Sequence, residues 1–524
     1  MINAAPMYFS TNAGIFGSSD LEARIANGSL QTVSLAEAII QGQAPDGGLY
    51  MPTHFPSLDI NKIWAMGIMD YWKVFVEVME PFFKGVLSKK TLEEIAKDAY
   101  AGYEGFEPVI EEVIDLNGMS MKPKEGGGYI IRLDEGPTLA FKDYAAQVLF
   151  RITEALMREQ PQIEIGQGKK LVDVDLLTYI TATSGDTGGA MGHAILNIDR
   201  MWMAILHSSH IGDEVSDLQA KQMSTLGGNV YSLWIDADFD GCQKIAQELL
   251  RDGDLQYMNL NSANSINIGR LLPQIAYYFY SYGRIASNPG EAVYFSVPSG
   301  NFGNAVAGLF AKKMGLPIRL IIGVNENDVF ERYFRTGIYN PAGDTKSSPS
   351  NSMNINWPSN MRRLFHLYGG QLIEAKDPGD PERKIVDPRS VMPNLDLMRE
   401  DIAASYSISD HETHNIIWNF YNEEHLIDGN IHSTLEPHGA VAYGAAQRYR
   451  QETGYRGKIA VFETAHPGKF PESLVDKGID IVMPANLARL ANRPHGRHFE
   501  VDADYNVIKG LIIQLHQQEL AKYK

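Results

Sequence analysis

Residues 176–198 read LLTYITATSGDTGGAMGHAILNI, and this stretch decides the fold class. Its first part, Leu176–Thr183, is an apolar run of the length that predicts a buried strand. Its last part, 187–198, has the small residues and the apolar spacing of a helix. The loop Thr181–Ala190, rich in hydroxyl groups and glycine, joins the two. A strand that passes through a short polar loop into a helix is the repeating unit of α/β folds.

The same alternation of strands and helices continues through most of the chain. It predicts an α/β fold with mainly parallel sheets and helices on both faces. In such sheets, ligands bind at the carboxyl ends of the strands. The other predicted strands are Tyr129–Leu133, Trp202–His207, Val230–Ile235, Val293–Val297, Leu320–Val324 and Ile459–Thr464, and the other predicted helices are 143–158, 239–251, 268–284 and 304–314.

The beginning of the chain has a different pattern. Helical spacing in Leu35–Ile40, 68–84 and 91–101 predicts a mostly helical N-terminal domain, which we place at 1–115. The remaining residues, 116–524, form the predicted α/β core, divided into two subdomains.

Three further stretches have a less direct meaning. Gly126–Gly128 stands before a predicted strand, which favours a hairpin or linker over a phosphate loop. Residues 340–360 are rich in Ser, Asn, Pro and Gly, and they predict either a long ordered loop or a mobile lid. The aromatic residues of Tyr277–Tyr282 are interpreted as helix packing.

Composition excludes several classes of protein. A net charge of −18 over 524 residues disfavours nucleic acid and anionic membranes as partners. No apolar window is long enough to span a membrane, and Met1–Pro6 lacks a basic region followed by an apolar run, which argues against a secretory signal. A single cysteine, Cys242, excludes an internal disulfide and is interpreted as a small buried apolar residue. We therefore expect a soluble, cytoplasmic protein of undetermined oligomeric state.

The segment Gly136–Asp143, with the sequence GPTLAFKD, contains the first candidate catalytic group. Lys142 follows an apolar tripeptide and precedes a predicted helix start. A lysine in partly apolar surroundings loses its proton near neutral pH and then forms a Schiff base with a carbonyl.

Two loops at strand ends are candidate anion sites. In the first, Ser184, Asp186 and Thr187 stand where the free N–H groups and the dipole of a helix favour negative charge. Asp186 and Thr187 could equally be simple helix N-caps. The second loop, Val297–Ala305, has two glycines that allow a phosphate to approach the backbone. Neither loop is a Walker motif.

A lysine and two anion loops together suit pyridoxal 5'-phosphate, with one loop for its phosphate and one for a substrate carboxylate. The chain also resembles the threonine synthase family, in the longer form found in bacteria and fungi. The resemblance spans nearly the whole chain in the order of the family. The matching segments are Leu35–Pro52, Gly136–Asp143, Thr181–Ala190, Asn264–Arg270, Val297–Asn304, Asn325–Asp328, Glu436–Val441 and Thr464–Phe470.

The resemblance implies a fold-type II pyridoxal-phosphate enzyme with the cofactor between two subdomains. It implies a lyase that eliminates phosphate from O-phospho-L-homoserine and adds water, giving L-threonine as the last step of threonine biosynthesis. A related phospho-lyase, or a serine/threonine dehydratase, is the alternative. A non-catalytic binding protein on the same scaffold is disfavoured, because the lysine and both loops are present.

The resemblance also implies a role for each matched residue. Lys142 binds the cofactor and moves protons, and Thr464 contacts the pyridine nitrogen, where a neutral hydroxyl gives less help to ring protonation than a carboxylate. The other roles fall into three groups: Gly300, Asn301, Phe302, Gly303 and Asn304 hold the cofactor phosphate, Ser184, Asp186 and Thr187 receive the substrate carboxylate, and Asn264, Ser265 and Arg270 contact the substrate phosphate.

Arg270 suits this role, because a guanidinium binds phosphate through two donors, although it could be a surface salt-bridge residue. The chain departs from the family at Asn354, where an aspartate is usual, at Gly439, where a bulkier residue is common, and at Pro273, which interrupts a predicted helix. His411–His414 has the wrong spacing for a zinc helix, so we expect no metal.

Overall fold

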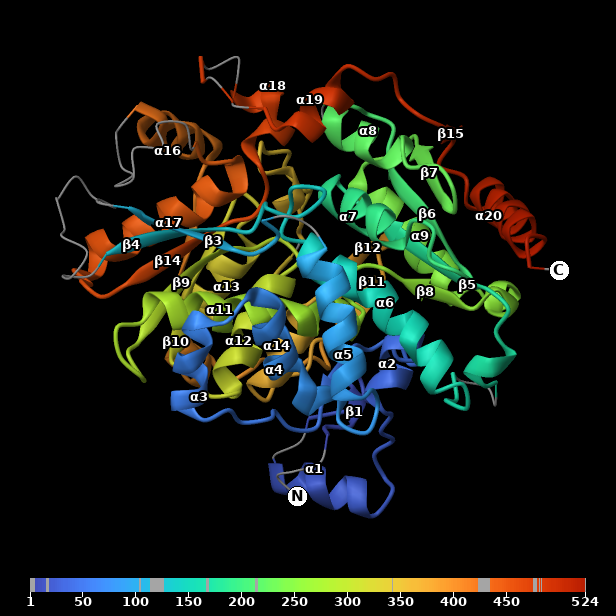
Figure 1. Ribbon diagram of the computed structural model, residues 1–524, viewed down its shortest axis with the longest axis horizontal. Helices are drawn as coiled ribbons and strands as arrows, with labels where there is room; N and C mark the ends of the chain where they lie inside the picture. The colour runs from blue at the N-terminus through green and yellow to red at the C-terminus, as the bar shows by residue number, and fades with distance from the viewer. Residues whose placement is uncertain are drawn as a thin grey trace.

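The computed structural model describes residues 5–15, 18–102, 105–113, 127–165, 169–212, 215–341, 343–422, 434–474, 478–479, 481 and 483–523. Two sheets lie side by side in these residues, and the N-terminal helices lie below them in Figure 1. No helix in these ranges is long and apolar enough to cross a membrane.

The first sheet contains five parallel strands in the order β15-β7-β6-β5-β8. Helices cover both faces, as alternation of strands and helices predicts. One face packs on α7 (Asp186–Ile195) and α8 (Asp217–Ser224), and the other on α9 (Phe239–Arg251) and α20 (Tyr505–Leu520). The strands are β5 (Leu177–Ala182), β6 (Met201–Ser208), β7 (Val230–Ile235), β8 (Leu260–Ser262) and β15 (His498–Val501).

The second sheet contains six strands in the order β13-β10-β9-β14-β4-β3. All neighbours are parallel except β3 and β4, which are antiparallel. One face packs on α16 (Asp410–Asn422) and α17 (Pro437–Thr453). The strands are β3 (Val109–Val113), β4 (Gly128–Arg132), β9 (Val293–Pro298), β10 (Ile318–Val324), β13 (Ile402–Ser407) and β14 (Ile459–Glu463).

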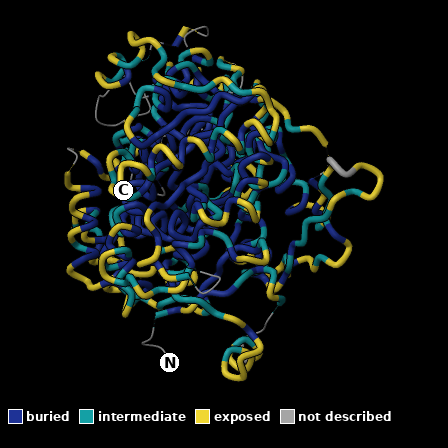
Figure 2. Tube along the Cα trace, turned by 90° about the vertical axis from the view of Figure 1, so that its right-hand side faces the viewer, coloured by how far each residue is buried: buried dark blue, intermediate teal, exposed yellow. Residues whose placement is uncertain are grey.

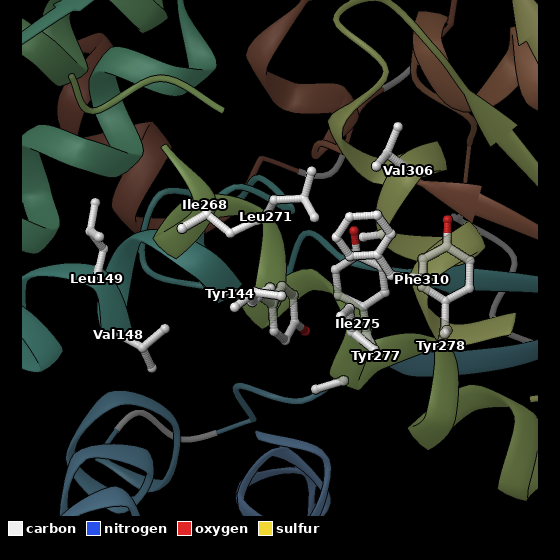
Figure 3. Close-up of a cluster of buried hydrophobic side chains, with 14 of the residues drawn as sticks. Tyr144, Val148, Leu149, Ile268, Leu271, Ile275, Tyr277, Tyr278, Val306 and Phe310 are labelled. Carbon is white, nitrogen blue, oxygen red and sulfur yellow. The ribbon is translucent and has the colours of Figure 1, made fainter. Parts of the chain in front are cut away.

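The main core lies between the sheets and the N-terminal helices. The chain through the interior is drawn as buried, in dark blue, in Figure 2. Figure 3 shows side chains of α6 (Asp143–Glu159), α10 (Ile268–Leu271), α11 (Ile275–Ile285) and α12 (Gly303–Lys313) meeting there. Tyr277 and Tyr278 are fully buried in this core, which confirms that the aromatic run packs a helix.

The N-terminal region contains α2 (Leu35–Gln41), α4 (Tyr71–Phe83) and α5 (Lys89–Ala96), close to the predicted helices. The predicted helix over 91–101 continues from α5 into a π-helical turn. Because β3 pairs with the core sheet and residues 114–126 lie outside the described ranges, the boundary at 115 stays a prediction. Gly126, in the predicted linker, also lies outside them.

The remaining elements complete the chain. They are β1 (Tyr8–Ser10), α1 (Ser18–Ala26), β2 (Tyr50–Pro52), α3 (Ile60–Ala65), α13 (Val329–Thr336), α14 (Met361–Leu367), β11 (Glu374–Asp377), β12 (Asp380–Val386), α15 (Leu395–Asp401), α18 (Pro471–Leu474) and α19 (Ala485–Ala491).

The predicted core strands all form, within two residues of the expected bounds. The helix predicted over 268–284 divides into α10 and α11, because Pro273 lies in a 3-10 turn over Leu272–Gln274. Cys242 is fully buried, as expected. The sequence patterns did not predict β3, β8, β13 or β15, which are short or lie at sheet edges.

Candidate active site

One cavity lies where β5, β9 and β14 end, at the carboxyl edges of the two sheets. All thirteen residues predicted for the site line it. They are Lys142, Ser184, Asp186, Thr187, Asn264, Ser265, Arg270, Gly300, Asn301, Phe302, Gly303, Asn304 and Thr464.

Lys142 lies directly before α6, and the chain leading to it runs beside the end of β14. The Phe141 N–H donates to the Thr464 carbonyl at 2.8 Å, which fixes the lysine against that strand. The Lys142 Nζ lies 3.4 Å from both Asp186 Oδ2 and Ser352 Oγ. Burial lowers the pKa of Lys142 and outweighs the opposing effect of Asp186. This environment fits the predicted nucleophilic amine.

Asp186 is buried between two lysines. Its Oδ1 lies 2.6 Å from Lys469 Nζ, opposite the contact with Lys142. Burial alone raises the pKa of Asp186, but the Lys469 and Lys142 ammonium groups outweigh it and hold the pKa well below its usual range. Because this carboxylate is charged, it repels a second carboxylate.

The alternative that Asp186 or Thr187 caps α7 is wrong. The cap residue is Gly185, whose φ of 132° is open to glycine but strained for other residues. A side chain at Gly185 would also meet Gln219, which donates to Asp186 at 2.9 Å. The loop therefore presents the start of a helix to the cavity, as an anion site requires.

The loop after β9 brings backbone and amide groups to the cavity. A Cβ at Gly300 would lie 2.5 Å from the Ser352 carbonyl oxygen, so only glycine fits there. Asn304 Oδ1 accepts hydrogen bonds from Tyr277 at 2.8 Å and from Tyr278 at 2.7 Å. Its Nδ2 is buried and has no acceptor within the described residues. Asn304 is thus oriented by the core with its N–H₂ group unused.

Arg270 reaches the cavity from α10 and is only 3% exposed, so the surface salt-bridge interpretation is wrong. It donates to the Ala263 carbonyl through Nη1, and its Nε has no acceptor within the described ranges. Burial lowers the pKa of Arg270 to about 10, which leaves the guanidinium charged at neutral pH. A buried positive charge with an unused donor is a site for an anion.

The segment leading to Arg270 is held by the N-terminal region. The amide groups of Asn261 and Asn267 donate to the Ile39 carbonyl at 3.1 and 3.0 Å, which satisfies the end of α2. Gly42 follows there, and a Cβ on it would lie 2.1 Å from Asn261 Oδ1. These contacts join the matching segment Leu35–Pro52 to the segment that precedes Arg270.

Several functional side chains were missed from the sequence. Arg363 is fully buried and donates to the Ser265 carbonyl at 2.8 Å and to the Ile266 carbonyl at 2.6 Å. No sequence signal distinguishes it from a surface arginine on α14. Lys469 lies in a matched segment, where an isolated lysine gave no hint of burial. Ser352 lies in the range 340–360, from which Ser352 and Met353 line the cavity.

The residues that depart from the family pattern also have structural reasons. Asn354 accepts from Asn325 at 2.9 Å and donates to the Ser348 carbonyl at 3.3 Å, so it fixes the loop with both ends of its amide. A Cβ at Gly439 would lie 1.6 Å from Glu463 Oε2, so glycine is required beside this buried carboxyl group. Among the described residues, no group of three or more His, Cys, Asp or Glu is placed to hold a metal ion.

Comparison with known proteins gives the same family at both ends of the chain. Residues 25–100 match the model of the threonine synthase N terminus, and residues 439–512 match that of the threonine synthase C-terminal part. The threonine synthase of Haemophilus influenzae is 32% identical over 491 residues, covering 92% of this chain and 97% of that protein. That of Saccharomyces cerevisiae is 30% identical and covers both chains completely.

Solved structures agree with this result. The crystal structure of threonine synthase from yeast has a TM-score of 0.79 at 28% identity, covering 99% of this chain and 100% of that one. A threonine synthase from Brucella melitensis, solved with bound PLP, has a TM-score of 0.76 at 26% identity and covers 98% and 100%. On this evidence, the chain belongs to the threonine synthase family, and its fold is that of a fold-type II pyridoxal-phosphate enzyme.

Proposed function

We propose that this protein converts O-phospho-L-homoserine and water to L-threonine and phosphate. The family assignment makes it a pyridoxal-phosphate-dependent threonine synthase, a lyase acting on a small molecule. The identity of the phosphorylated substrate and the role of each side chain are our proposals. The observation that carries them is one cavity that is lined by a lysine with a lowered pKa and by a buried arginine whose Nε has no acceptor among the described residues.

The side chains fit the cofactor. Asn304 Nδ2 is a buried donor without an acceptor among the described residues, and Asn304 lies in the first turn of α12. That loop, Gly300–Asn304, can hold the cofactor phosphate with backbone N–H groups and this amide. Thr464 would contact the pyridine nitrogen, and Lys142 would bind the aldehyde carbon. When bound, pyridoxal phosphate supplies an electron sink for carbanion chemistry.

Arg270 gives the site its preference for a phosphorylated substrate. With Asn264 and Ser265 it would hold the phosphate that leaves, since a guanidinium binds phosphate more strongly than it binds neutral groups. The backbone at the start of α7 and the hydroxyls of Ser184 and Thr187 would hold the substrate carboxylate. A plain hydroxy amino acid would leave Arg270 unpaired, which disfavours a dehydratase.

Lys142 is placed to move protons. Its lowered pKa supplies a neutral amine as a base, and Asp186 at 3.4 Å stabilises the ammonium that forms when the amine takes a proton. Its side chain is 13% exposed, so bulk water has limited access to this exchange. The sequence-based prediction of a cytoplasmic location remains part of this proposal.

The test is an analysis of products. Purified protein loaded with pyridoxal phosphate and given O-phospho-L-homoserine should release threonine and phosphate in equal amounts. Phosphate with a keto acid in place of threonine would identify the related phospho-lyase instead. Lys142→Ala should lose the visible absorption band of the lysine-bound cofactor and nearly all turnover. Lys90→Ala, at a lysine that is 85% exposed, is the matched control and should keep both.

A further inference from the structure

The hydroxyl proton of Thr464 points away from the cavity and into the protein. Thr464 lines the cavity and is 5% exposed, and its Oγ1 donates to Glu436 Oε1 at 3.0 Å. A hydroxyl group has one proton and two lone pairs. Because the proton is used on Glu436, Thr464 offers only lone pairs to whatever it contacts in the cavity.

Glu436 is an acceptor in this bond because its other contacts are donors. It is fully buried and caps α17, accepting the N–H groups of His438 at 2.7 Å and Gly439 at 2.9 Å. His438 Nδ1 makes a further contact with Oε2. Thr464 adds its hydroxyl and, at 3.4 Å, its backbone N–H, so five donors face the four lone-pair sites of an ionised carboxylate. No position remains for a proton on Glu436 itself.

His438 fixes the direction of its own contact. Its Nε2 accepts the backbone N–H of Ser352 at 3.2 Å, and a backbone N–H can only donate. The imidazole is therefore neutral with its proton on Nδ1, which donates to Glu436. This histidine is 3% exposed and connects Glu436 with the loop that carries Ser352 beside Lys142.

Glu436 and Glu463 are two buried carboxyl groups in contact, and the negative charge of the pair lies on Glu436. Glu463 accepts the Glu436 N–H at 2.5 Å, and its Oε2 has no partner within the described residues. Burial, and then the Glu436 carboxylate, raise the pKa of Glu463 well above its usual value, so that it stays neutral. Arg132 and Asp134 are further charged groups near Glu436 and Glu463, and burial raises the pKa of Asp134 as well.

We infer that Glu436 is a positioning residue which, through Thr464, makes the site select the cofactor's pyridine nitrogen in its protonated form. This rests on the proposed function, in which Thr464 contacts that nitrogen. A protonated nitrogen donates to the Thr464 lone pair, whereas an unprotonated one would place two lone pairs against each other. The carboxylate behind Thr464 also favours a positive ring. A neutral hydroxyl alone predicted little help with protonation, and Glu436 changes that expectation.

The direct test measures the ring nitrogen itself. The protein is loaded with pyridoxal phosphate carrying ¹⁵N in the ring, and its ¹⁵N chemical shift is recorded at neutral pH beside the visible band of the lysine-bound cofactor. Wild type should show the shift of a protonated pyridine. Thr464→Val, which keeps the other four contacts of Glu436 and the shape of the side chain, should move the resonance to the unprotonated position. Thr464→Ser should restore the wild-type shift.

Two carboxyl-to-amide variants distinguish the effect of the Thr464–Glu436 hydrogen bond from the electrostatic effect of the buried carboxyl groups in general. Glu436→Gln should move the resonance to the unprotonated position. Glu463→Gln, at a fully buried neighbour that does not contact the Thr464 hydroxyl, should leave it unchanged. If Glu436→Gln fails to fold because the helix cap is lost, Thr464→Val still decides.

An unprotonated ring in wild type with the lysine-bound band present would overturn this inference and leave the proposed function intact. An unchanged shift in Thr464→Val would overturn it equally. Failure of wild type to bind the cofactor at all would overturn both.

Discussion

Two buried arginines contact or belong to the segment Asn264–Arg270, and their hydrogen bonds differ. Arg363 on α14 donates to the start of the segment, and Arg270 on α10 ends it. Arg363 is fully buried and donates from Nε, Nη1 and Nη2 to the Tyr50, Ser265 and Ile266 carbonyls and to Asn360. Arg270 is 3% exposed and keeps an unused Nε beside the cavity. A guanidinium whose three nitrogens all donate hydrogen bonds within the protein serves the fold. One with an unused nitrogen is available to a ligand.

The difference predicts that loss of Arg363 damages the fold. Arg363→Met removes the donor of the buried Tyr50 carbonyl and of the partly buried Ser265 and Ile266 carbonyls, each at a cost of about 1–3 kcal/mol. We expect the apparent free energy of unfolding to fall by at least about 3 kcal/mol, measured by denaturant unfolding. The control is Arg335→Met, because the Arg335 side chain is 64% exposed and pairs with Glu331 at the surface. It should change the free energy of unfolding by less than about 1 kcal/mol. Equal stability of Arg363→Met and wild type would contradict the scaffold role.

Loss of Arg270 should instead damage catalysis. In Arg270→Met we expect kcat/KM for O-phospho-L-homoserine to fall by about 2 kcal/mol or more, roughly 30-fold, because a charge-assisted contact to phosphate is removed. Stability should fall by less than in Arg363→Met, because only the Ala263 carbonyl loses its donor and the unused Nε disappears with the side chain. Steady-state kinetics and thermal unfolding check both parts. An unchanged kcat/KM in a folded variant would remove Arg270 from the site.

Asn304 combines both kinds of group in one side chain, because its oxygen is saturated by tyrosines and its nitrogen is unused. Tyr278→Phe removes one of the two donors that orient the amide and keeps the buried ring. We expect pyridoxal phosphate to bind about fivefold more weakly, which corresponds to about 1 kcal/mol. Titration of the apoprotein with the cofactor, followed by absorbance, measures this. Unchanged affinity would show that the tyrosines do not orient Asn304.

An unused donor away from the cavity should have no role in catalysis. The Tyr144 hydroxyl is buried in the aromatic core without a partner among the described residues, and it does not line the cavity. Tyr144→Phe should leave kcat/KM unchanged and should change stability by no more than about 1 kcal/mol. A large loss of activity would mean that unused donors mark more than the binding site.

Much of this comparison could not be predicted from the sequence. Strand and helix periodicity predicted the core elements. The loops after Leu176–Thr183 and Val293–Val297 were predicted to bind ligands at the carboxyl ends of their strands, and these two strands lie in different sheets. Lys142, Thr464 and Arg270 were assigned through the resemblance to a family. All of these residues do line one cavity.

The supporting residues were hidden for a physical reason. Arg363, Lys469 and Glu436 are charged, and charged residues are rarely buried without partners. Their partners lie far along the chain, such as Tyr50 for Arg363 and Asp186 for Lys469. Composition and spacing carry no record of such contacts. The same limit explains why Asp186 was assigned to the substrate before its two lysines were known.

The central claim is that the unused donor of the buried Arg270 serves the phosphate of the substrate. Calorimetric titration of the cofactor-loaded enzyme with inorganic phosphate, the proposed product, tests it most directly. Wild type should bind one phosphate per chain, and Arg270→Met should lose this binding while remaining folded and loaded with cofactor. Binding of equal affinity in Arg270→Met and wild type would contradict the account.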